Sequence, residues 1–527
     1  MFKQYILKFL LCGVLSAINL PTLLAQNNVV ILNCQRSLKM IRGEGKTYVI
    51  KKNINLKGRT IIFPKNSIVN YKKGCLKNGQ VIFNNATLTG NVAFEGRVSG
   101  TVTNDTIQVS WFKNKDFSLT DCFNMSEGKI VFFEKGCRYE VNNCFQIPSC
   151  TIFGNGSTIE VGNIKEHSPV SDYIKIRNKH YDGGGTDSFS IYNLNFVSTT
   201  DGTFLFSISH ANDVKLLNCS FKCYGTSEKC MHSLDVRGNV DRLLIDDCEI
   251  VNMTGAKAGG GLWLRSFGSI RDVEINRCRF QNNTTDETFA LNAVVGDICN
   301  VKVIGCSFEY YRNNRCPDPH VFWGMTKTEK GNNHNVLIKN NTLRSDYLPS
   351  FLINTSNAKN VILEHNYFEF SDFTMLDSKL TTNLFNGEMS CIDNEIVVKS
   401  LIGSTSAETQ INIFSGDVTV RQTKIFNDCK QCHLGASCIY DSEIYFDNSQ
   451  LFNGSLPLMM KGNHIRLGTG TPSLAANPYS HRGKCCWEDN VIESDCKVFF
   501  NLMYEGVKIE SKNNLFKGVN MQGIKVN

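Results

Sequence analysis

One pattern of apolar residues recurs along most of the chain and limits what it can fold into. The pattern runs apolar, any, apolar, any, any, then Cys or Asn (sometimes Thr or Ser), any, apolar, as in Val214–Phe221 and Val336–Leu343. Its closing apolar residues are Phe221, Ile250, Phe280, Phe308, Leu343, Phe368, Ile396, Ile425, Ile444, Ile465, Ile492 and Phe516. Gaps of 19 to 35 residues between them are typical of a solenoid whose coils carry loops of different length.

Within each repeat the apolar residues alternate, skip one step and alternate again. This spacing predicts two short strands joined by a two-residue turn, whereas a helical repeat would show spacings of three and four. A third strand precedes each template, for example Ser233–Arg237, Leu262–Arg265 and Ser350–Asn354. We therefore expect an all-β fold, a single-stranded right-handed parallel β-helix (β-solenoid) with three strands per coil.

The position two residues before each closing apolar residue predicts a ladder. It reads Cys219, Cys248, Cys278, Cys306, Asn341, Asn366, Asn394, Thr423, Ser442, Asn463, Asn490 and Asn514. Stacked coils lie about 4.8 Å apart, so like side chains would pile up: thiols first, then amides that can bond to one another and to the turn backbone. We favour inward packing for the thiols, and disulfides between adjacent coils are the alternative.

The first residues predict export. Lys3 and Lys8 flank an apolar run, and Leu23–Ala25 precedes a plausible cleavage site, so residues 1–25 read as a signal peptide. The mature protein is then expected to be secreted, periplasmic or on the cell surface. No later stretch approaches the roughly 18 apolar residues of a membrane span. Without the two leader lysines, 54 basic residues face 49 acidic ones, which permits an acidic partner without requiring one.

Two further segments carry a resemblance to a known family. Trp111–Phe112 opens a stretch that continues through Gly128–Val141 to Ile152–Ile159. It is similar to the amphipathic cap and first coils of pectate-lyase-3 type proteins, within the pectate lyase-like superfamily of right-handed parallel β-helices. The resemblance implies a β-helix domain over residues 111–527. Upstream, short β turns around Leu56–Pro64 and Gly74–Phe83 suggest an N-terminal β extension over residues 26–110.

The resemblance implies a fold but no reaction, because this fold hosts lyases, hydrolases, isomerases and adhesins. The motifs of polygalacturonase-like chains, of true pectate lyases and of the alginate and chondroitin lyase family are not recognisable here. No cofactor or metal site is predicted. Calcium stays open, since Asp and Asn oxygens are too common in this chain to be diagnostic.

The outward residues of the third strand offer the first candidate site. With Leu234 and Val236 inward, Asp235 and Arg237 face outward, and the next coil presents Trp263 and Arg265. Arg237 and Arg265 should therefore lie side by side. Two guanidiniums could hold a carboxylate or sulfate, and in a lyase they would stabilise charge developing beside it. Trp263 could stack on a sugar. The simpler explanation is an exposed charge ladder on a sheet face.

Other residues complete the candidate groove. Asp286 and Glu287, in a loop near the same coils, could act with Asp235 as acid and base, although acidic loop residues are most often only solvated. The predicted catalytic set is Asp235, Arg237, Arg265, Asp286 and Glu287. The predicted substrate-binding set, which packing alone could also explain, is Trp263, Asn292, Tyr311, Arg312, His320 and Trp323.

Two functions remain open from the sequence. The leading one is a polysaccharide lyase or glycoside hydrolase acting on an acidic polysaccharide, such as a polymer containing uronic acid. The alternative is a non-catalytic, glycan-binding or adhesive β-helix surface protein. Nucleic-acid binding is not expected, because basic residues look dispersed and no zinc or helix-turn-helix pattern occurs. We expect a monomer.

Overall fold

The structure is a computed structural model and describes most of the chain. The described residues are 28–113, 116–141, 144–162, 172–177, 188–199, 204–224, 231–255, 259–284, 287–311, 321–327, 330–345, 351–373, 381–400, 410–429, 432–471, 473–479, 484–501 and 508–522. The predicted signal peptide lies outside them. Contacts divide the chain into two units: unit 1 comprises residues up to Asp105 with Ser110–Met125, and unit 2 comprises Thr106–Val109 and Ser126–Asn527.

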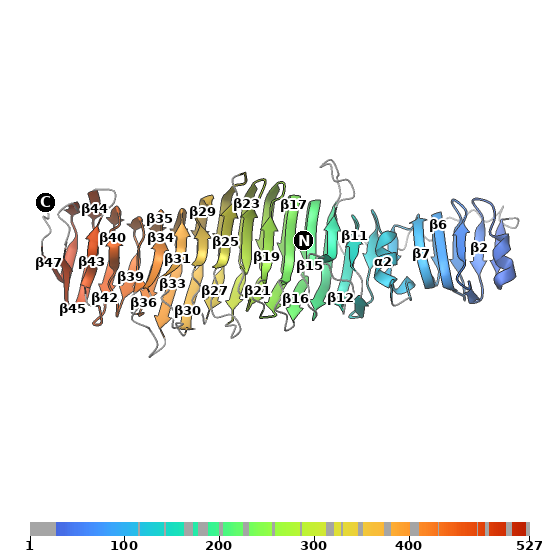
Figure 1. Ribbon diagram of the computed structural model, residues 1–527, viewed down its shortest axis with the longest axis horizontal. Coiled ribbons are helices and arrows are strands. Elements are labelled where there is room, and N and C mark those ends of the chain that lie inside the picture. The colour runs from blue at the N-terminus through green and yellow to red at the C-terminus, as the bar shows by residue number, and fades with distance from the viewer. Residues whose placement is uncertain are drawn as a thin grey trace, which may run out of the picture. The chain divides into compact units, whose positions relative to one another are not determined.

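Unit 2 is a parallel β-helix with three strands per coil (Figure 1). Each strand pairs in parallel with the strand one coil later, for example β20 with β23 and β23 with β26. The strands therefore form three columns, which we call A, B and C, and several long strands turn a corner from one column into the next. This confirms the predicted all-β parallel β-helix.

The strands of column A follow the predicted third-strand position. They are β11 (Phe145–Ile147), β13 (Asp172–Arg177), the first parts of β15 (Phe204–Leu217) and β17 (Met231–Asp246), β19 (Gly259–Arg265), β22 (Phe289–Ala293), β25 (Val321–Lys327), β28 (Phe351–Thr355), β31 (Thr381–Gly387), β34 (Gln410–Ser415), β37 (Cys432–His433), β40 (Phe452–Ser455), β43 (Ser473–Tyr479) and the last parts of β45 (Val491–Asn501) and β47 (Leu515–Gln522).

Column B carries the first strand of the repeated pattern. It contains β8 (Thr106–Gln108), β9 (Ile130–Phe132), the first parts of β12 (Thr151–Val161) and β14 (Phe189–Ser198), the second parts of β15 and β17, β20 (Ile270–Asn276), β23 (Ile298–Ile304), β26 (Asn333–Lys339), β29 (Ala358–Glu364), β32 (Met389–Ile392), β35 (Val418–Arg421), β38 (Cys438–Tyr440), β41 (Met459–Lys461), β44 (Lys484–Glu488) and β46 (Lys508–Lys512).

Column C carries the second strand of the pattern. It contains β10 (Arg138–Val141), the second parts of β12 and β14, β16 (Ser220–Tyr224), β18 (Glu249–Met253), β21 (Arg279–Asn282), β24 (Ser307–Tyr310), β27 (Thr342–Ser345), β30 (Tyr367–Phe373), β33 (Glu395–Ser400), β36 (Lys424–Asn427), β39 (Glu443–Phe446), β42 (His464–Leu467) and the first parts of β45 and β47.

A left-handed residue makes the corner between columns B and C. The residue just before each ladder position has a φ between 48° and 69°. Asn, Asp and Gly, which adopt this conformation at least cost, occupy most of these positions. They are Asn218, Asp247, Arg277, Gly305, Asn340, His365, Asp393, Gln422, Asp441, Gly462, Asp489 and Asn513. One residue in this conformation turns the chain sharply enough for the next residue to point inward.

The core is built from side chains stacked coil on coil. Phe206, Leu234, Leu262, Phe289 and Trp323 share one register position in column A and are essentially inaccessible to solvent. Because each coil adds the same apolar position, burial continues from one coil to the next without a separate hydrophobic centre.

The amide part of the predicted ladder is present. The backbone N–H of Asn341 donates to Oδ1 of Asn366 at 2.9 Å, and the backbone N–H of Asn366 donates to Oδ1 of Asn394 at 2.9 Å. The Nδ2 group of Asn366 donates to the carbonyl of Ile338 in the preceding coil, also at 2.9 Å. The Asn366 amide therefore satisfies two buried backbone groups of the preceding coil, which would be costly to leave unpaired.

The cysteine part of the ladder follows the same geometry with weaker groups. The backbone N–H of Cys278 donates to Sγ of Cys306 at 3.3 Å, and that thiol lies 3.5 Å from the carbonyl of Ile275, to which it donates. Cys219 and Cys248 repeat the arrangement. All four are buried free thiols. The structure therefore shows the predicted inward packing and no disulfide between these four cysteines.

Unit 1 is a smaller parallel β-helix built from shorter coils. Parallel pairing connects β1 to β2, β2 to β5 and β5 to β6, and β6 also pairs with β3, β4 and β7. Its elements are β1 (Val29–Leu32), the 3-10 helix η1 (Gln35–Met40), β2 (Thr47–Ile50), β3 (Ile54–Asn55), β4 (Thr60–Phe63), β5 (Ile68–Tyr71), β6 (Leu76–Gly90), β7 (Phe94–Val102) and α2 (Ser118–Asn124), and the 3-10 turn η2 (Val109–Trp111) straddles the division. Helix α2 is tied to β7 because the buried Asp121 accepts from the backbone N–H of Val98 at 2.8 Å.

We predict that Asn366→Leu will loosen the ladder locally. The substitution leaves the backbone N–H of Asn341 and the carbonyl of Ile338 buried without their partners, each at a cost of about 1–3 kcal/mol. Amide hydrogen exchange at Asn341 should become at least tenfold faster. Asn366→Cys should have a smaller effect, because cysteine already fills this position at Cys306.

The exposed substitution Lys359→Ala serves as the control and should leave exchange at Asn341 unchanged. Equal exchange rates in the Leu variant and the parent protein would show that the ladder does not hold adjacent coils together.

Candidate functional site

The predicted pair of arginines lies on the outer face of column A, on neighbouring strands. Arg237 of β17 and Arg265 of β19 are register partners, as are Asp235 and Trp263 on the same two strands. Asn292 of β22 is the next partner of Arg265. The register therefore brings together Asp235, Arg237, Trp263, Arg265 and Asn292.

Asp235 holds both guanidiniums, and we call these three residues the arginine clamp. Nε of Arg265 donates to Oδ1 of Asp235 at 2.8 Å, and Nε of Arg237 donates to Oδ2 at 2.5 Å. The carboxylate is fully buried, whereas the side chains of Arg237 and Arg265 remain 21% and 19% exposed. Burial raises the pKa of the Asp235 carboxyl, and the two positive charges act in the opposite direction.

Aromatic rings flank the clamp. The ring of His232 stacks on Phe204 with centroids 5.1 Å apart and lies 4.2 Å from the ring of Trp263. The guanidinium carbons of Arg237 and Arg265 lie 4.5 Å and 4.9 Å from the centroid of Phe204, within the range of a cation–π contact. These contacts and Asp235 together fix both guanidiniums in place.

His232 is buried beside two cations and stays neutral. Burial lowers the pKa of its imidazole well below the ordinary value, and the charges of Arg265 and Arg237 lower it further. Strict alternation from Leu234 and Val236 would place His232 inside the helix. The pairing leaves out Ser233 and its neighbours Leu205 and Gly261 without a shift in register, and the buried hydroxyl of Ser233 donates to the carbonyl of Val251 at 2.7 Å. Alternation is therefore interrupted at Ser233, and His232 packs against the rings of Phe204 and Trp263.

Glu287 reaches the same face from the segment before β22. Its backbone carbonyl accepts from Nε1 of Trp263 at 3.3 Å. Its carboxylate lies against Gly324 of β25, where a Cβ atom would come within 2.7 Å of Oε1. Gly324 is the register partner of Ala290, which is the partner of Trp263. The carboxylate therefore lies against the third strand beyond Asp235 on one outward column.

The remaining predicted residues fall elsewhere. Trp323 points into the core, where its ring is 4.4 Å from that of Phe308, so its proposed role as a sugar platform is corrected to a packing role. Tyr311 follows β24 and donates to Oε2 of Glu309 at 2.7 Å, on the outer side of column C. Asp286, Arg312 and His320 lie outside the described residues.

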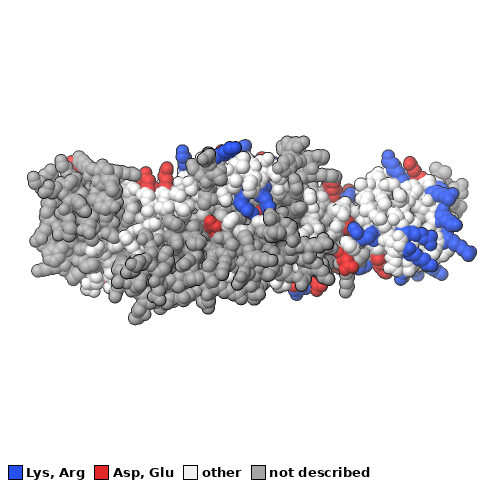
Figure 2. Space-filling view, viewed as in Figure 1, with Lys and Arg blue, Asp and Glu red and all other residues white. Residues whose placement is uncertain are grey.

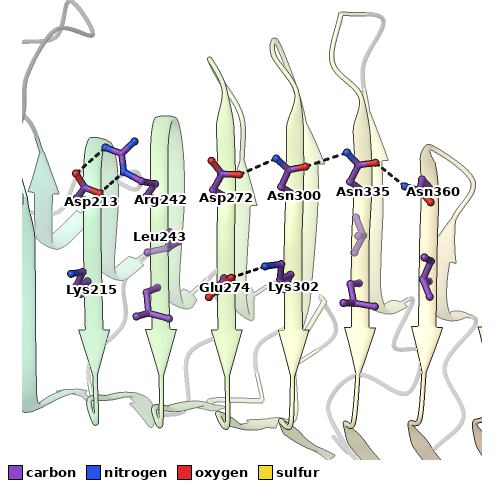
Figure 3. A pocket seen from close by; sticks show the side chains of 14 residues that line it. Asp213, Lys215, Arg242, Leu243, Asp272, Glu274, Asn300, Lys302, Asn335 and Asn360 are labelled. Atoms are coloured by element: carbon purple, nitrogen blue, oxygen red, sulfur yellow. Dashed lines mark hydrogen bonds and ion pairs between the residues drawn. The ribbon is translucent and has the colours of Figure 1, made fainter. Parts of the chain in front are cut away.

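A second concave surface lies on the outer face of column B (Figure 3). It is a shallow groove of about 770 Å³ over β15, β17, β20, β23, β26 and β29. Six left-handed residues form its upper row: Asp213, Arg242, Asp272, Asn300, Asn335 and Asn360. Below them, Leu337 and Ile362 form a half-buried apolar floor beside Lys302 and Glu274.

The polar groups of this groove bond mainly to one another. Nδ2 of Asn335 donates to Asn300 at 3.1 Å, and Nδ2 of Asn360 donates to Asn335 at 2.8 Å. Lys302 pairs with Glu274 at 2.8 Å. These ladders support the left-handed kink in each column B strand and cancel most of the local charge. The groove therefore resembles a structural surface more than a site for an ion.

Among the residues that the structure describes, no group of three or more His, Cys, Asp or Glu side chains could hold a metal ion. Within the same residues, no helix is long and apolar enough to cross a membrane.

Comparisons with known proteins add little about function. No protein-family model matches the chain, and no curated protein does. Among solved structures, the chain is similar to the surface protein and adhesin PfbA of Streptococcus pneumoniae, with 12% identity, a TM-score of 0.30, and coverage of 80% of this chain and 99% of that one. The fold described above rests on the strand pairing of this chain itself.

The burial of His232 predicts a pH dependence of stability. An unfolded histidine takes up a proton near pH 6.5, whereas His232 stays neutral in the folded protein. Stability should therefore be fully present above pH 6.5 and should fall as the pH drops below it, by up to about 1.4 kcal/mol per pH unit. His232→Phe, which keeps the ring stack, should remove this contribution.

The measurement is the free energy of unfolding of both proteins between pH 7.5 and 5.5. The difference between the two profiles isolates His232, because Asp235 is present in both. Parallel profiles would contradict the account of a buried, neutral imidazole.

Proposed function

We propose that the protein is a glycan-binding β-helix that holds an acidic polysaccharide, such as a uronic acid polymer, on the arginine clamp. The observation that carries this proposal is the shared ion pair of Asp235 with two half-buried guanidiniums on adjacent strands. Held rigidly, these guanidiniums have little conformational entropy left to lose when a carboxylate binds. The half-buried ring of Trp263 beside them would support the sugar.

The charge balance of the clamp favours an anion. Two guanidiniums and one carboxylate leave a net positive charge, and the neutral His232 adds none. The side chains of both arginines are partly exposed, so a ligand carboxylate could approach them without displacing Asp235. Charge-assisted bonds of this kind are among the stronger polar contacts in proteins.

Binding without turnover is favoured over cleavage by the state of the two nearest titratable groups. Both carboxylate oxygens of Asp235 are occupied by guanidiniums, and the side chain is fully buried. His232 is 1% exposed and packs against the rings of Phe204 and Trp263. A general acid or base must reach the substrate proton directly or through one water, and neither group meets this condition.

Cleavage remains the second candidate, because Glu287 is half-buried on the same outward face. In that case the clamp would neutralise a uronate carboxylate and so acidify the neighbouring C–H bond. Glu287 would be the available carboxylate for proton transfer or for attack at the glycosidic bond. The predicted signal peptide would place either activity outside the cytoplasm.

We predict that removing the clamp charges will abolish selective binding of acidic sugars. The triple variant Asp235→Asn, Arg237→Gln, Arg265→Gln avoids leaving a lone buried carboxylate. It should bind uronic-acid oligosaccharides at least tenfold more weakly than the parent protein in calorimetry. The methyl-esterified oligosaccharides should bind the parent protein about as weakly as the acids bind the variant.

Arg242→Gln is the matched control, since Arg242 is an exposed arginine that pairs with Asp213 on another face. Unchanged affinity in the triple variant, or equal affinity for the ester, would contradict the proposal. The same oligosaccharides should be followed for unsaturated products and new reducing ends. If the parent protein cleaves these oligosaccharides and Glu287→Gln does not, the protein is an enzyme and the second candidate, cleavage, is correct.

A further inference from the structure

Positive charge is concentrated in unit 1. Residues 28–105 carry 13 Lys and Arg against three Asp and Glu, whereas residues 126–527 carry 39 against 44. Over the whole chain these numbers nearly cancel, so the basic residues look dispersed. Figure 2 shows the Lys and Arg side chains gathered over the segment that Figure 1 colours blue. The two units therefore differ in charge as well as in coil length.

Four lysines stack at one corner of this unit, and we call them the lysine corner: Lys51, Lys52, Lys72 and Lys73. Each pair directly follows one of two register partners, Ile50 of β2 and Tyr71 of β5. The backbone N–H of Lys51 donates to Leu32 at 3.0 Å, and that of Lys72 donates to Ile50 at 3.2 Å. Adjacent coils are about 4.8 Å apart, so the two pairs lie one above the other.

Gly74 allows the two corners to approach closely. A Cβ atom at this position would come within 2.3 Å of the Lys52 carbonyl group, so a larger residue would force the coils apart. All four lysines are exposed. The corner therefore presents four ammonium groups on two tightly stacked turns.

Folding alone does not account for this arrangement. Within the described part of the chain, no ion pair is recorded for any of the four lysines, and like charges so close together repel. Several lysines of unit 2, in contrast, form ion pairs with glutamates on adjacent coils. Lys302 pairs with Glu274, Lys339 with Glu364, and Lys461 and Lys512 with Glu488. The unpaired lysines of unit 1 thus cost stability in the absence of a partner.

We propose that the lysine corner binds a polyanionic polysaccharide, whose sulfate or carboxylate groups lie along the stacked turns. Among the described residues of unit 1, the exposed large apolar ones are Val29, Ile31, Met40, Ile62 and Ile68, and none belongs to the corner. This argues against a lipid surface, which is usually bound by cations together with inserted apolar side chains. Among the described residues of the strands β2 to β7, Tyr48, Tyr71, Phe63, Phe83 and Phe94 are buried, so there is no aromatic platform there for unstacked nucleic-acid bases.

This surface goes beyond the arginine clamp and works differently. The clamp would bind one carboxylate with two fixed guanidiniums, whereas the lysine corner would bind a polyanion by the attraction of four closely spaced charges on flexible side chains. Its binding should therefore weaken steeply with salt as bound counterions are released. The two surfaces lie on different units, so each can be removed without changing the other.

The test uses the full mature chain and dextran sulfate as the probe, with uncharged dextran as the blank. The variant replaces Lys51, Lys52, Lys72 and Lys73 with Gln. We expect at least tenfold weaker binding at 0.1 M salt. A plot of log affinity against log salt should also lose about three to four units of slope, since each of the four lysines contributes about 0.7 to 0.9.

The matched control replaces Lys302, Lys339, Lys461 and Lys512 with Gln, which gives the same change in net charge on unit 2. It should bind dextran sulfate nearly as well as the parent protein. The corner variant should also unfold at the same temperature as the parent or higher, because repulsion is removed. A lower unfolding temperature would contradict the claim that these lysines serve a partner rather than the fold.

Three other results would overturn the proposal. They are equal loss of binding in the corner and control variants, tighter binding of duplex DNA than of dextran sulfate through the same lysines, and tighter binding of anionic lipid vesicles through them. The triple variant of the arginine clamp should keep its affinity for dextran sulfate, which separates this proposal from the proposed function.

Discussion

The stacking of like positions from coil to coil is the constraint on which the rest of the structure depends. A parallel β-helix leaves buried backbone groups at every corner, and at the corner between columns B and C one inward side chain per coil satisfies them. The side chain of Asn366 accepts from one backbone N–H and donates to one backbone carbonyl, and the thiol of Cys306 does the same. Once the corners stack, the register of all three columns is fixed, and any pair of outward residues on adjacent coils becomes a potential site.

The arginine clamp follows from that register. Arg237 and Arg265 meet because β17 and β19 pair without a shift over these residues, and Asp235 lies where it can bond to both. Because Asp235 is fully buried and bonded to both guanidiniums, removing either arginine would leave buried charge less well compensated, which is strongly destabilising. The same arrangement occupies both oxygens of Asp235, which supports the proposed binding role.

Much of this could be predicted from the sequence, because the fold repeats a short pattern many times. The ladder positions, the three strands per coil and the pairing of Arg237 with Arg265 all follow from period and spacing. Alternation alone does not place His232 beside the clamp, because the pattern is interrupted at Ser233. The sequence does not settle the side of Trp323 for a related reason: a single strand has two alternative phases, and only the neighbouring coils decide between them.

The most direct test of the central claim is a crystal structure of the protein bound to a uronic-acid oligosaccharide. The account predicts one sugar carboxylate within hydrogen-bonding distance of both Arg237 and Arg265, with Asp235 still bonded to both guanidiniums and a sugar ring against Trp263. An oligosaccharide bound elsewhere on unit 2, with no density at the clamp, would contradict it.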